Sequence, residues 1–381
     1  MQSLRHPLGL YVLFFTEMWE RFSFYGMRAI LVLYMVSETK AQNPGLGWDN
    51  AYALSIYGWY AMAVYMASIP GGYLADRYIG QKKAVMIGGF LLCLGHSILA
   101  VKAVWAFSLG ISFIVLGVGC LKPNISTMVG GLYKEGDSQR DLGFIIFYMG
   151  INLGAFLSAL IVGYVGETIN WHYGFGLAGL GMILGQIVFI WGQKHLQGVG
   201  DRIVIMKEQR QEKQPLTQAE KDKLWVMILC FALNILFWSA YEQAGGLMNL
   251  YAMEKVDRMI GGFTVPASFF QSLNPLFIML FGTIVGAFWI RRGKLGKESS
   301  SLFKIAMGIA VMGSGFALMA TASWQAWHAA DQKAAMIWLV GAYFLHTIGE
   351  LCLSPVSLSF ITRLAPARYA SLLMGLYFAS T

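Results

Sequence analysis

The chain has 381 residues, of which 57% are hydrophobic and only 13% are charged, and its mean hydropathy is +0.56. Since a soluble globular chain carries about 25% charged residues, this composition excludes an ordinary cytosolic enzyme, a disordered regulator and a disulfide-stabilised scaffold. The formal net charge of +8 does not indicate nucleic-acid binding, because the basic residues lie in loops between apolar segments, where membrane topology explains them.

Apolar runs recur along the whole chain. One crossing of a bilayer needs about 20 apolar residues, and these runs are continuous rather than alternating, which predicts helices and not a β-barrel. We therefore predict an all-α polytopic membrane protein. The expected spans are 8–36, 50–74, 83–101, 103–130, 141–166, 171–193, 224–252, 263–290, 302–323, 334–361 and 369 onward. The last run is still apolar at Thr381, so we expect the chain to end within an eleventh transmembrane helix.

The loops carry an uneven distribution of positive charge. Of the 28 Lys and Arg residues, twenty fall in the N-terminus and the loops on its side, five fall in the opposite loops and three fall within spans. This bias predicts a cytoplasmic N-terminus. The one long polar segment is 194–223. We therefore expect an N-terminal six-helix bundle at 1–193, a cytoplasmic linker at 194–223 and an incomplete C-terminal helical bundle at 224–381.

Two loops in corresponding places echo each other. The loop after the second span reads GYLADRYIGQK (72–82), the loop after the eighth reads GAFWIRRGKLGK (286–297), and both place Arg five residues after Gly. Two similar helical bundles with a site at their interface are a recurrent plan of transporters. The first loop resembles the signature loop of the major facilitator superfamily, and this resemblance makes Asp76 and Arg77 candidate gating residues.

Seven ionisable residues fall within the predicted spans: Glu17, Glu20, Arg21, Arg28, Lys122, Glu242 and Glu350. An ionisable group at bilayer depth costs several kcal/mol unless it is paired or wetted, so each one is a candidate functional residue. At 100° per residue, an arc of about 140° contains Glu17, Glu20, Arg21, Tyr25 and Arg28. We expect this face to line an aqueous cavity. The alternative for Glu17, Glu20 and Arg21 is an internal salt bridge between neighbouring turns.

The separated charges predict what such a cavity binds. Arg28 and Lys122 make a positive pole that suits a carboxylate, whereas Glu350 and Glu242 make a negative pole that suits an ammonium group. Carboxylates at bilayer depth also offer proton acceptors. The residues therefore favour a proton-linked carrier of small zwitterions, but they do not indicate peptides specifically.

Several segments resemble one family. EMWERFSFYG (17–26) is similar to the ExxERFxYYG motif of the proton-dependent oligopeptide transporter family, with Phe24 in place of the first Tyr of the pair. FYMGINLG (147–154) resembles the family's second motif, FYxxINxG. Family members carry similar strings at four more places: LKPN (121–124), FW to EQ (237–243), QSLNP (271–275) and GELCLSP (349–355).

This resemblance implies a major facilitator fold and a proton-coupled symporter that imports di- and tripeptides by alternating access. Arg28 and Lys122 would bind the peptide carboxylate, and Glu350 would bind its ammonium group. The remaining substrate-binding residues implied by the resemblance are Tyr25, Tyr65, Asn152, Trp238, Asn274 and Ser354. The implied proton-coupling residues are Glu17, Glu20, Arg21, Lys122 and Glu242, with Glu242 pairing with Arg28.

The family also implies a bacterial inner (plasma) membrane, activity as a monomer, and neither cofactor nor metal. One departure is that bacterial members usually insert two helices between the bundles, whereas 194–223 is too short and polar to span twice. The alternative function is a major facilitator carrier for another small zwitterion, an anion or a drug, since fold alone does not fix the substrate. A receptor that binds without translocating remains open. An intramembrane enzyme is disfavoured, because the sequence contains neither HExxH nor GxSxG.

Overall fold

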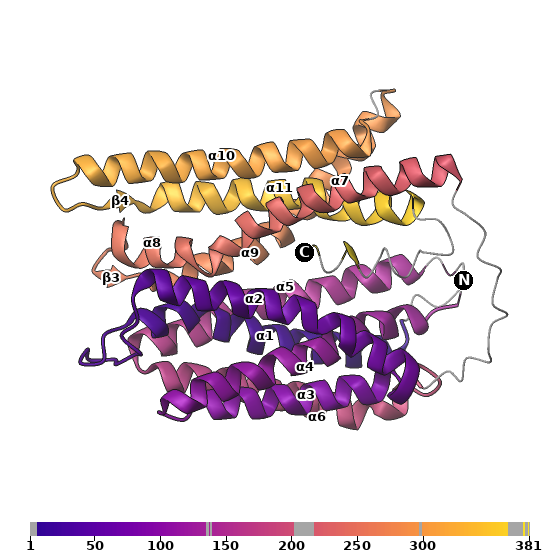
Figure 1. Ribbon diagram of the computed structural model, residues 1–381, viewed down its shortest axis with the longest axis horizontal. Helices are drawn as coiled ribbons and strands as arrows, with labels where there is room; N and C mark the ends of the chain where they lie inside the picture. Colours follow the sequence, from indigo (N-terminus) through magenta and orange to yellow (C-terminus); the bar gives the residue numbers. More distant parts are fainter. Residues whose placement is uncertain are drawn as a thin grey trace. The chain divides into compact units, whose positions relative to one another are not determined.

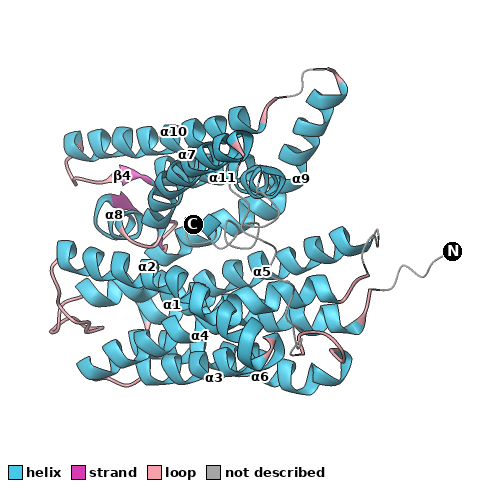
Figure 2. Cartoon of the chain, turned by 45° about the vertical axis from the view of Figure 1, so that its right-hand side comes forward, coloured by secondary structure: helices cyan, strands magenta, loops and turns pink. Residues whose placement is uncertain are grey.

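The computed structural model describes residues 6–134, 137, 139–201, 217–296, 299–364, 376–377 and 380. Contacts within the chain define two compact units. Unit 1 comprises Met1–Ile203, Ala244–Glu254 and Arg258–Leu276, and unit 2 comprises Val204–Gln243, Lys255–Asp257 and Phe277–Thr381. Long helices dominate both units, and the strands are only two residues long (Figures 1 and 2).

Unit 1 is built mainly from the first six long helices. These are α1 (Leu8–Val36), α2 (Asn50–Leu74), α3 (Gln81–Leu99), α4 (Val104–Gly131), α5 (Gln139–Thr168) and α6 (Trp171–Gly192). Two short helical turns follow α2 and α6, namely η1 (Ala75–Ile79) and η2 (Gln193–His195). Helix α1 packs against α5 and α6, α4 packs against α2 and α3, and α6 packs against α3.

Close packing between these helices depends on small residues. A Cβ atom placed on Gly154, in the FYMGINLG segment of α5, would overlap the backbone carbonyl of Met18 on α1. A Cβ atom on Gly71 of α2 would overlap the backbone of Gly119 on α4. Backbones approach this closely in membrane bundles where the residue has no side chain. The FYMGINLG segment of α5 and the glycine near the end of α2 therefore contribute to helix packing.

Unit 1 also contains a segment from the second half of the chain. It comprises α8 (Leu247–Lys255), a hairpin of β2 (Met259–Ile260) and β3 (Phe263–Thr264), the 3-10 helix η4 (Ala267–Ser272) and the start of α9 (Leu273–Lys294). Gly261 and Gly262 form the hairpin turn with φ angles of 53° and 86°, a conformation that glycine adopts without strain. Helix η4 packs against α5.

Among its described residues, unit 2 contains three long helices besides the rest of α9. They are α7 (Gln218–Tyr241), α10 (Ser301–His328) and α11 (Met336–Leu364). Helix α11 packs against α10 and α7, around a buried apolar cluster that includes Phe237, Ile305, Met312 and Leu353. A short parallel pairing of β1 (Val256–Asp257) with β4 (Ala334–Ala335) joins two of the loops.

The helices reproduce ten of the predicted spans, but three predicted boundaries in the second half are wrong. Helix α7 begins at Gln218 rather than 224, because Thr217 and Glu220 form a reciprocal capping box. The predicted span 224–252 is interrupted by the 3-10 turn η3 (Glu242–Ala244) and by Gly245 and Gly246. The predicted span from 263 begins as the β3 strand and η4, and α9 starts only at Leu273. The span predicted from 369 onward lies almost entirely outside the described residues.

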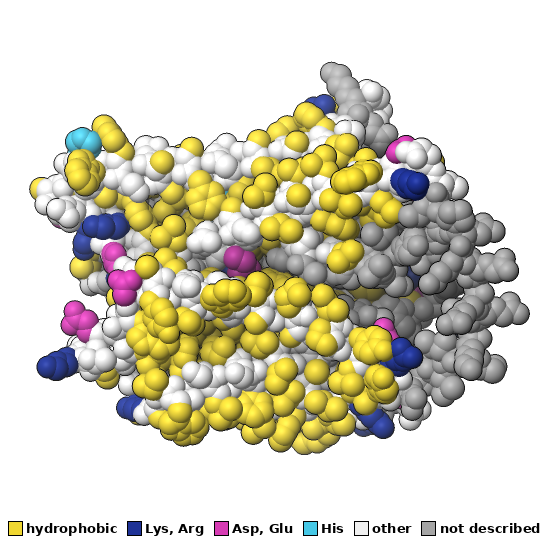
Figure 3. Space-filling view, in the orientation of Figure 1, with side chains coloured by type: hydrophobic (Ala, Val, Ile, Leu, Met, Phe, Trp, Pro, Cys, Tyr) yellow, Lys and Arg dark blue, Asp and Glu magenta, His cyan; other side chains and the backbone are white. Residues whose placement is uncertain are grey.

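The described helices have the length and composition of membrane spans. Eight helical segments of the described chain are long and apolar enough to cross a bilayer. Helices α1 and α2 fall outside this set although they have 29 and 25 residues, because α1 carries four charged residues and α2 is rich in Tyr and Gly. Hydrophobic side chains cover much of the face shown in Figure 3, and most of the charged side chains lie towards the helix ends.

Candidate functional site

The densest group of charges in unit 1 lies on α1. Glu17, Glu20 and Arg21 are all buried, with exposed fractions of 2%, 0% and 3%. The Nε atom of Arg21 lies 2.7 Å from an oxygen of each carboxylate, but it donates a hydrogen bond only to Glu17. The alternative of an internal salt bridge is therefore realised among all three residues, whereas the expectation that this face lines an aqueous cavity stays a prediction.

This α1 group has more negative than positive charge of its own. Among the described residues, Glu17 Oε2, both oxygens of Glu20 and Arg21 Nη2 have no hydrogen-bond partner. Lys122 on α4 contributes a compensating electrostatic interaction with Glu20. A buried carboxylate without donors is costly, and the charge of Glu20 is balanced mainly by Arg21 on the same helix, with a smaller contribution from Lys122 on α4.

Arg28 lies two turns further along α1. Its side chain is 5% exposed, its Nε donates a 2.9 Å hydrogen bond to Tyr57 Oη on α2, and its guanidinium lies 5.6 Å from the centre of the Tyr25 ring. The backbone of Gly245 packs against this pair, since a Cβ atom at 245 would overlap Tyr57 Oη and lie 2.7 Å from Arg28 Nε. Tyr57 and Gly245 were not among the predicted site residues.

Lys122 is placed by α4 in a similar setting. Its Nζ lies 4.5 Å from the centre of the Tyr65 ring on α2, which is cation–π distance. Unit 1 thus brings each of its two candidate carboxylate-binding cations, Arg28 and Lys122, onto the face of a predicted pocket tyrosine.

Two predicted amide side chains also lie in unit 1. Asn152 on α5 is buried and donates a 2.9 Å hydrogen bond to the carbonyl of Tyr148 in its own helix. Asn274, the second residue of α9, is half-buried. Their predicted contact with a substrate backbone stays a prediction.

The second-half candidates in unit 2 lie on α7, η3 and α11. Trp238 donates a 3.2 Å hydrogen bond to Asn234, which in turn donates a 2.8 Å bond to Ser380. Glu350 is 8% exposed, Ser354 lies one turn further along α11, and Glu242 begins η3. Trp238 stacks edge-on against Phe237 and Tyr241, with ring centres 5.6 and 5.0 Å apart. Three aromatic side chains are therefore in contact on α7, and the predicted role of Trp238 as a wall of the substrate pocket stays a prediction.

The predicted gating pair lies at an exposed helix end. Asp76 and Arg77 lie in η1 and are exposed, and Arg77 donates a 2.7 Å hydrogen bond to Tyr73 one turn earlier. Nearby, Lys82 binds the start of the polar linker: its Nζ donates to Asp201 at 2.9 Å, and its backbone N–H donates to the carbonyl of Gly200 at 2.9 Å. This hydrogen bond with Lys82 lowers the pKa of the Asp201 carboxyl below its ordinary value.

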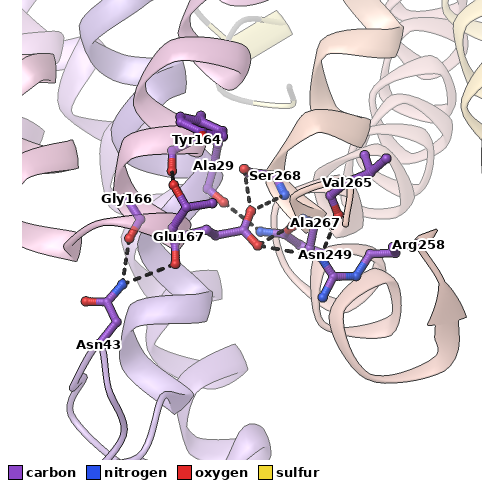
Figure 4. Close-up of polar contacts among 11 residues, drawn as sticks. Ala29, Asn43, Tyr164, Gly166, Glu167, Asn249, Arg258, Val265, Ala267 and Ser268 are labelled. Atoms are coloured by element: carbon purple, nitrogen blue, oxygen red, sulfur yellow. Dashed lines mark hydrogen bonds and ion pairs between the residues drawn. The ribbon is translucent and has the colours of Figure 1, made fainter. Parts of the chain in front are cut away.

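A half-buried carboxylate in unit 1, Glu167, was missed. It lies in the last turn of α5, directly after the predicted span 141–166, and its carboxylate accepts hydrogen bonds from η4 (Figure 4). The sequence contained only a weak signal, an acidic residue at the end of an apolar run. Its partners lie about 100 residues further along the chain, so no local spacing connects them.

The sequence matches one family throughout most of its length. The profile of the POT family matches residues 82–212 and 201–381. The uncharacterised transporter YclF of Bacillus subtilis is 38% identical, over 98% of this chain and 85% of that protein. The peptide transporter YePEPT of Yersinia enterocolitica is 36% identical, over 99% and 85%. A di-/tripeptide transporter of Lactococcus lactis subsp. cremoris is 34% identical, over 98% and 86%.

Solved structures show the same likeness. A mutant of a peptide transporter POT in complex with sulfate has a TM-score of 0.92 and 37% identity, and the match covers 100% of this chain and 87% of that one. A POT family transporter in complex with 5-aminolevulinic acid has a TM-score of 0.89 and 32% identity, covering 99% and 88%. The chain therefore belongs to the POT family: it is a multi-pass membrane protein with the major facilitator fold.

Proposed function

We propose that this protein is a proton-coupled symporter that imports di- and tripeptides by alternating access. The proposal rests on two cations in unit 1. Arg28 lies against the Tyr25 ring and donates a hydrogen bond to Tyr57, and Lys122 lies over the Tyr65 ring. Two relatives at 36% and 34% identity are a peptide transporter and a di-/tripeptide transporter. A peptide offers the carboxylate that two such cations would bind.

The carboxylate end of the substrate would bind in unit 1. A guanidinium and an ammonium group held on aromatic faces keep their charge and their donors, and a carboxylate binds best to such charge-assisted donors. Arg28 donates through Nε to Tyr57 and lies against the Tyr25 ring, and these two contacts orient its guanidinium group. Tyr25 and Tyr65 would then form apolar walls beside the bound carboxylate.

The ammonium end would bind on residues of unit 2. Glu350 is a buried carboxylate, Ser354 follows it by one turn, and Trp238 contributes an aromatic surface. Asn152 and Asn274 would bind the amide groups between the two charged ends, because each offers a donor and an acceptor. A substrate with an ammonium group, an amide and a carboxylate would match all of these groups.

Proton coupling would follow because Lys122 would interact both with Glu20 and with the peptide carboxylate. In the structure Lys122 compensates part of the charge of Glu20. When a peptide carboxylate binds Lys122, the carboxylates of Glu17 and Glu20 would keep only Arg21 as a close partner, and a proton on one of them would restore neutrality. Glu242, in the 3-10 turn η3, would pair with Arg28, and Asp76 and Arg77 would gate the inner side. Such charge exchanges shift populations between conformations.

The test is uptake of radiolabelled dialanine into liposomes that contain the full-length protein. We expect accumulation when the outside is acidic relative to the lumen, and loss of accumulation when the gradient is collapsed by an ionophore. Uptake that does not respond to an imposed pH gradient would overturn proton coupling, and absence of peptide uptake would overturn peptide transport. A cytoplasmic N-terminus, a bacterial inner membrane and activity as a monomer belong to the same proposal.

One observation favours a second candidate function, a carrier of other small zwitterions. A relative at 32% identity was solved with 5-aminolevulinic acid, which carries an amino group and a carboxylate without a peptide bond. The groups at Arg28, Lys122 and Glu350 would bind such a molecule as well. Competition against labelled dialanine separates the candidates: stronger inhibition by 5-aminolevulinic acid than by unlabelled dipeptides would favour the second.

A further inference from the structure

Glu167 holds a segment of the second half of the chain against α5. Its Oε2 accepts a 2.9 Å hydrogen bond from the Ala267 N–H and lies 3.9 Å from Arg258 Nη1. Its Oε1 accepts a 2.8 Å bond from the Ser268 N–H and a 2.5 Å bond from the Ser268 hydroxyl. Figure 4 shows these donors converging on the one carboxylate. We call this group the Glu167 latch: Glu167, Arg258, Ala267 and Ser268.

The surface of α5 around the carboxylate fits the same segment. A Cβ atom on Gly163, one turn before Glu167, would overlap the Ser268 hydroxyl. The Tyr164 ring lies 6.4 Å from the Phe269 ring, centre to centre. Residues 163, 164 and 167 lie on one face of a helix, so η4 rests on a single stripe of α5 with the carboxylate at its end.

Glu167 does not by itself stabilise α5. Glu167 is the penultimate residue of α5, and a negative charge near the C-terminus of a helix opposes the helix dipole. At the other side of the contact, the two N–H groups are those of the first residues of η4, which have no partner within that helix. The placement of Glu167 is therefore explained by the contact with η4 and not by the stability of α5.

The second-half part of unit 1, Ala244–Glu254 and Arg258–Leu276, is called the latched segment below. It has a second attachment, on α1. The carbonyl of Ala29 accepts hydrogen bonds from Asn249 of α8 at 2.7 Å and from Gln271 of η4 at 3.3 Å. Both contacts involve neutral groups, and a carbonyl in mid-helix already accepts its own helical bond. The charge-assisted contacts at Glu167 are the stronger ones.

Chain continuity makes these contacts relevant to conformational change. The latched segment follows α7 through η3, and it continues into the part of α9 that starts at Phe277. It therefore belongs to unit 1 by its contacts, although both of its ends continue into unit 2. Any movement of α7 and α9 relative to α5 has to break the latch or bend the chain at both ends of the segment.

We propose that Glu167 is a gating residue, which holds the segment 258–268 against α5 in one half of the transport cycle and releases it in the other. This inference rests on the proposed function, because only alternating access requires the release. The charge distribution of the loops predicts that the latch lies on the outer side, together with Lys40 and Arg258. Glu167 would then stabilise the state in which the outer side is closed.

The test measures the distance between spin labels on two parts of unit 1. The labels are placed at the exposed Lys40, between α1 and α2, and at the exposed Met259 of the hairpin, in a parent whose four native cysteines are replaced and whose uptake is checked. A second pair, at Lys40 and Lys102, reports on the first-half loops alone. We compare the parent with Glu167→Gln and with a matched control, Glu254→Gln, whose carboxylate accepts an exposed hydrogen bond from Asn50.

In Glu167→Gln we expect the ratio of long to short Lys40–Met259 distances to rise about tenfold, since that is the effect of losing one charge-assisted contact network on a two-state equilibrium. The Lys40–Lys102 distances and the Glu254→Gln variant should match the parent. Unchanged Lys40–Met259 distances in Glu167→Gln, or the same increase in Glu254→Gln, would overturn the proposal.

Two further measurements keep the outcome interpretable. If Glu167→Gln does not fold, Ser268→Ala removes only the hydroxyl donor, and it should shift the same distances in the same direction by a smaller factor; no shift there counts against the latch. Uptake of labelled dialanine is measured separately on the parent. A distance shift without peptide uptake would overturn the proposed function but keep the latch. Peptide uptake without a distance shift would overturn the latch but keep the proposed function.

Discussion

Among the described residues of unit 1, the buried carboxylates on α1 and the half-buried carboxylate of Glu167 differ in the number of hydrogen-bond donors around them. On α1, the carboxylates of Glu17 and Glu20 share a single close cation, Arg21, and three of their four oxygens have no hydrogen-bond partner among the described residues. At the end of α5, the one carboxylate of Glu167 accepts three hydrogen bonds and has Arg258 beside it.

This difference indicates two different roles for an acidic residue near the membrane. A carboxylate that is surrounded by donors is stable as an anion, and it anchors whatever carries the donors. A carboxylate that lacks donors is stabilised by a proton or by a nearby cation. The proposed proton exchange would therefore use the α1 group, whereas the Glu167 latch would hold and release a segment.

The largest expected effect comes from removing the charges that exchange partners. Glu20→Gln and Lys122→Ala should each reduce gradient-driven uptake of labelled dialanine to the level of empty liposomes, because neither variant can couple a proton to the charge of Lys122. Counterflow exchange, which needs no net proton movement, should survive in Glu20→Gln, whose amide resembles the protonated acid. Full gradient-driven uptake in both variants would refute the role of the α1 group in coupling.

A comparison of stability separates the two groups further. Arg21→Gln should destabilise the protein by about 3–5 kcal/mol, because it leaves two buried carboxylates without their close cation. Arg258→Gln should cost about 1 kcal/mol or less, because Arg258 is 3.9 Å from a carboxylate that keeps three other donors.

Thermal unfolding in detergent measures both changes. The double variant Glu17→Gln/Arg21→Gln should recover part of the loss, because it removes one of the unpaired carboxylates along with the cation. Equal shifts for Arg21→Gln and Arg258→Gln would show that the number of donors does not distinguish the two groups.

The contact between Gly245 and the Arg28–Tyr57 pair gives a smaller and more local prediction. Gly245→Ala should raise the KM for dialanine about tenfold, a loss equivalent to one good contact, because the added methyl group displaces Tyr57 and Arg28. Gly58→Ala, next to Tyr57 on α2, is the matched control, since a Cβ atom at 58 would meet nothing within 4 Å. Transport kinetics at equal amounts of folded protein measure both. An equal KM in the two variants would contradict a role of Gly245 at Arg28.

Local sequence patterns were sufficient to predict most of the helices and the charged face of α1. The apolar runs and the helical period place Glu17, Glu20 and Arg21 side by side, and the structure confirms that arrangement. The family motifs also pointed to Tyr25 and Tyr65, which lie beside Arg28 and Lys122.

What the sequence did not reveal depends on contacts between distant segments. Glu167 meets Ala267 and Ser268, and Gly245 meets Tyr57; neither pairing has a characteristic spacing, because each depends on how helices far apart in the chain pack. The break at η3 was also missed, since hydrophobicity continues through Gly245 and Gly246. The capping box of Thr217 and Glu220 was visible in the sequence, but the polar composition of the surrounding segment obscured it.

The smallest expected effect concerns Asp201, a carboxylate that is exposed to water. Its hydrogen bond with Lys82 lowers its pKa, and its side chain is 62% exposed. A lowered pKa in the folded state stabilises the protein above the ordinary carboxyl pKa of about 4, and the stabilisation is lost as the pH falls through the folded-state value. Because exposed pairs are weak, Lys82→Gln should lower the unfolding temperature at pH 7 by about 1 °C, and this difference should shrink as the pH falls below the ordinary carboxyl pKa. Lys83→Gln, which removes the neighbouring exposed charge, should show no such pH dependence.

A large shift of the unfolding temperature in Lys82→Gln would mean that the attachment of the linker stabilises unit 1 far more than an exposed ion pair does. The number of hydrogen-bond donors alone would then not rank the three carboxylate environments.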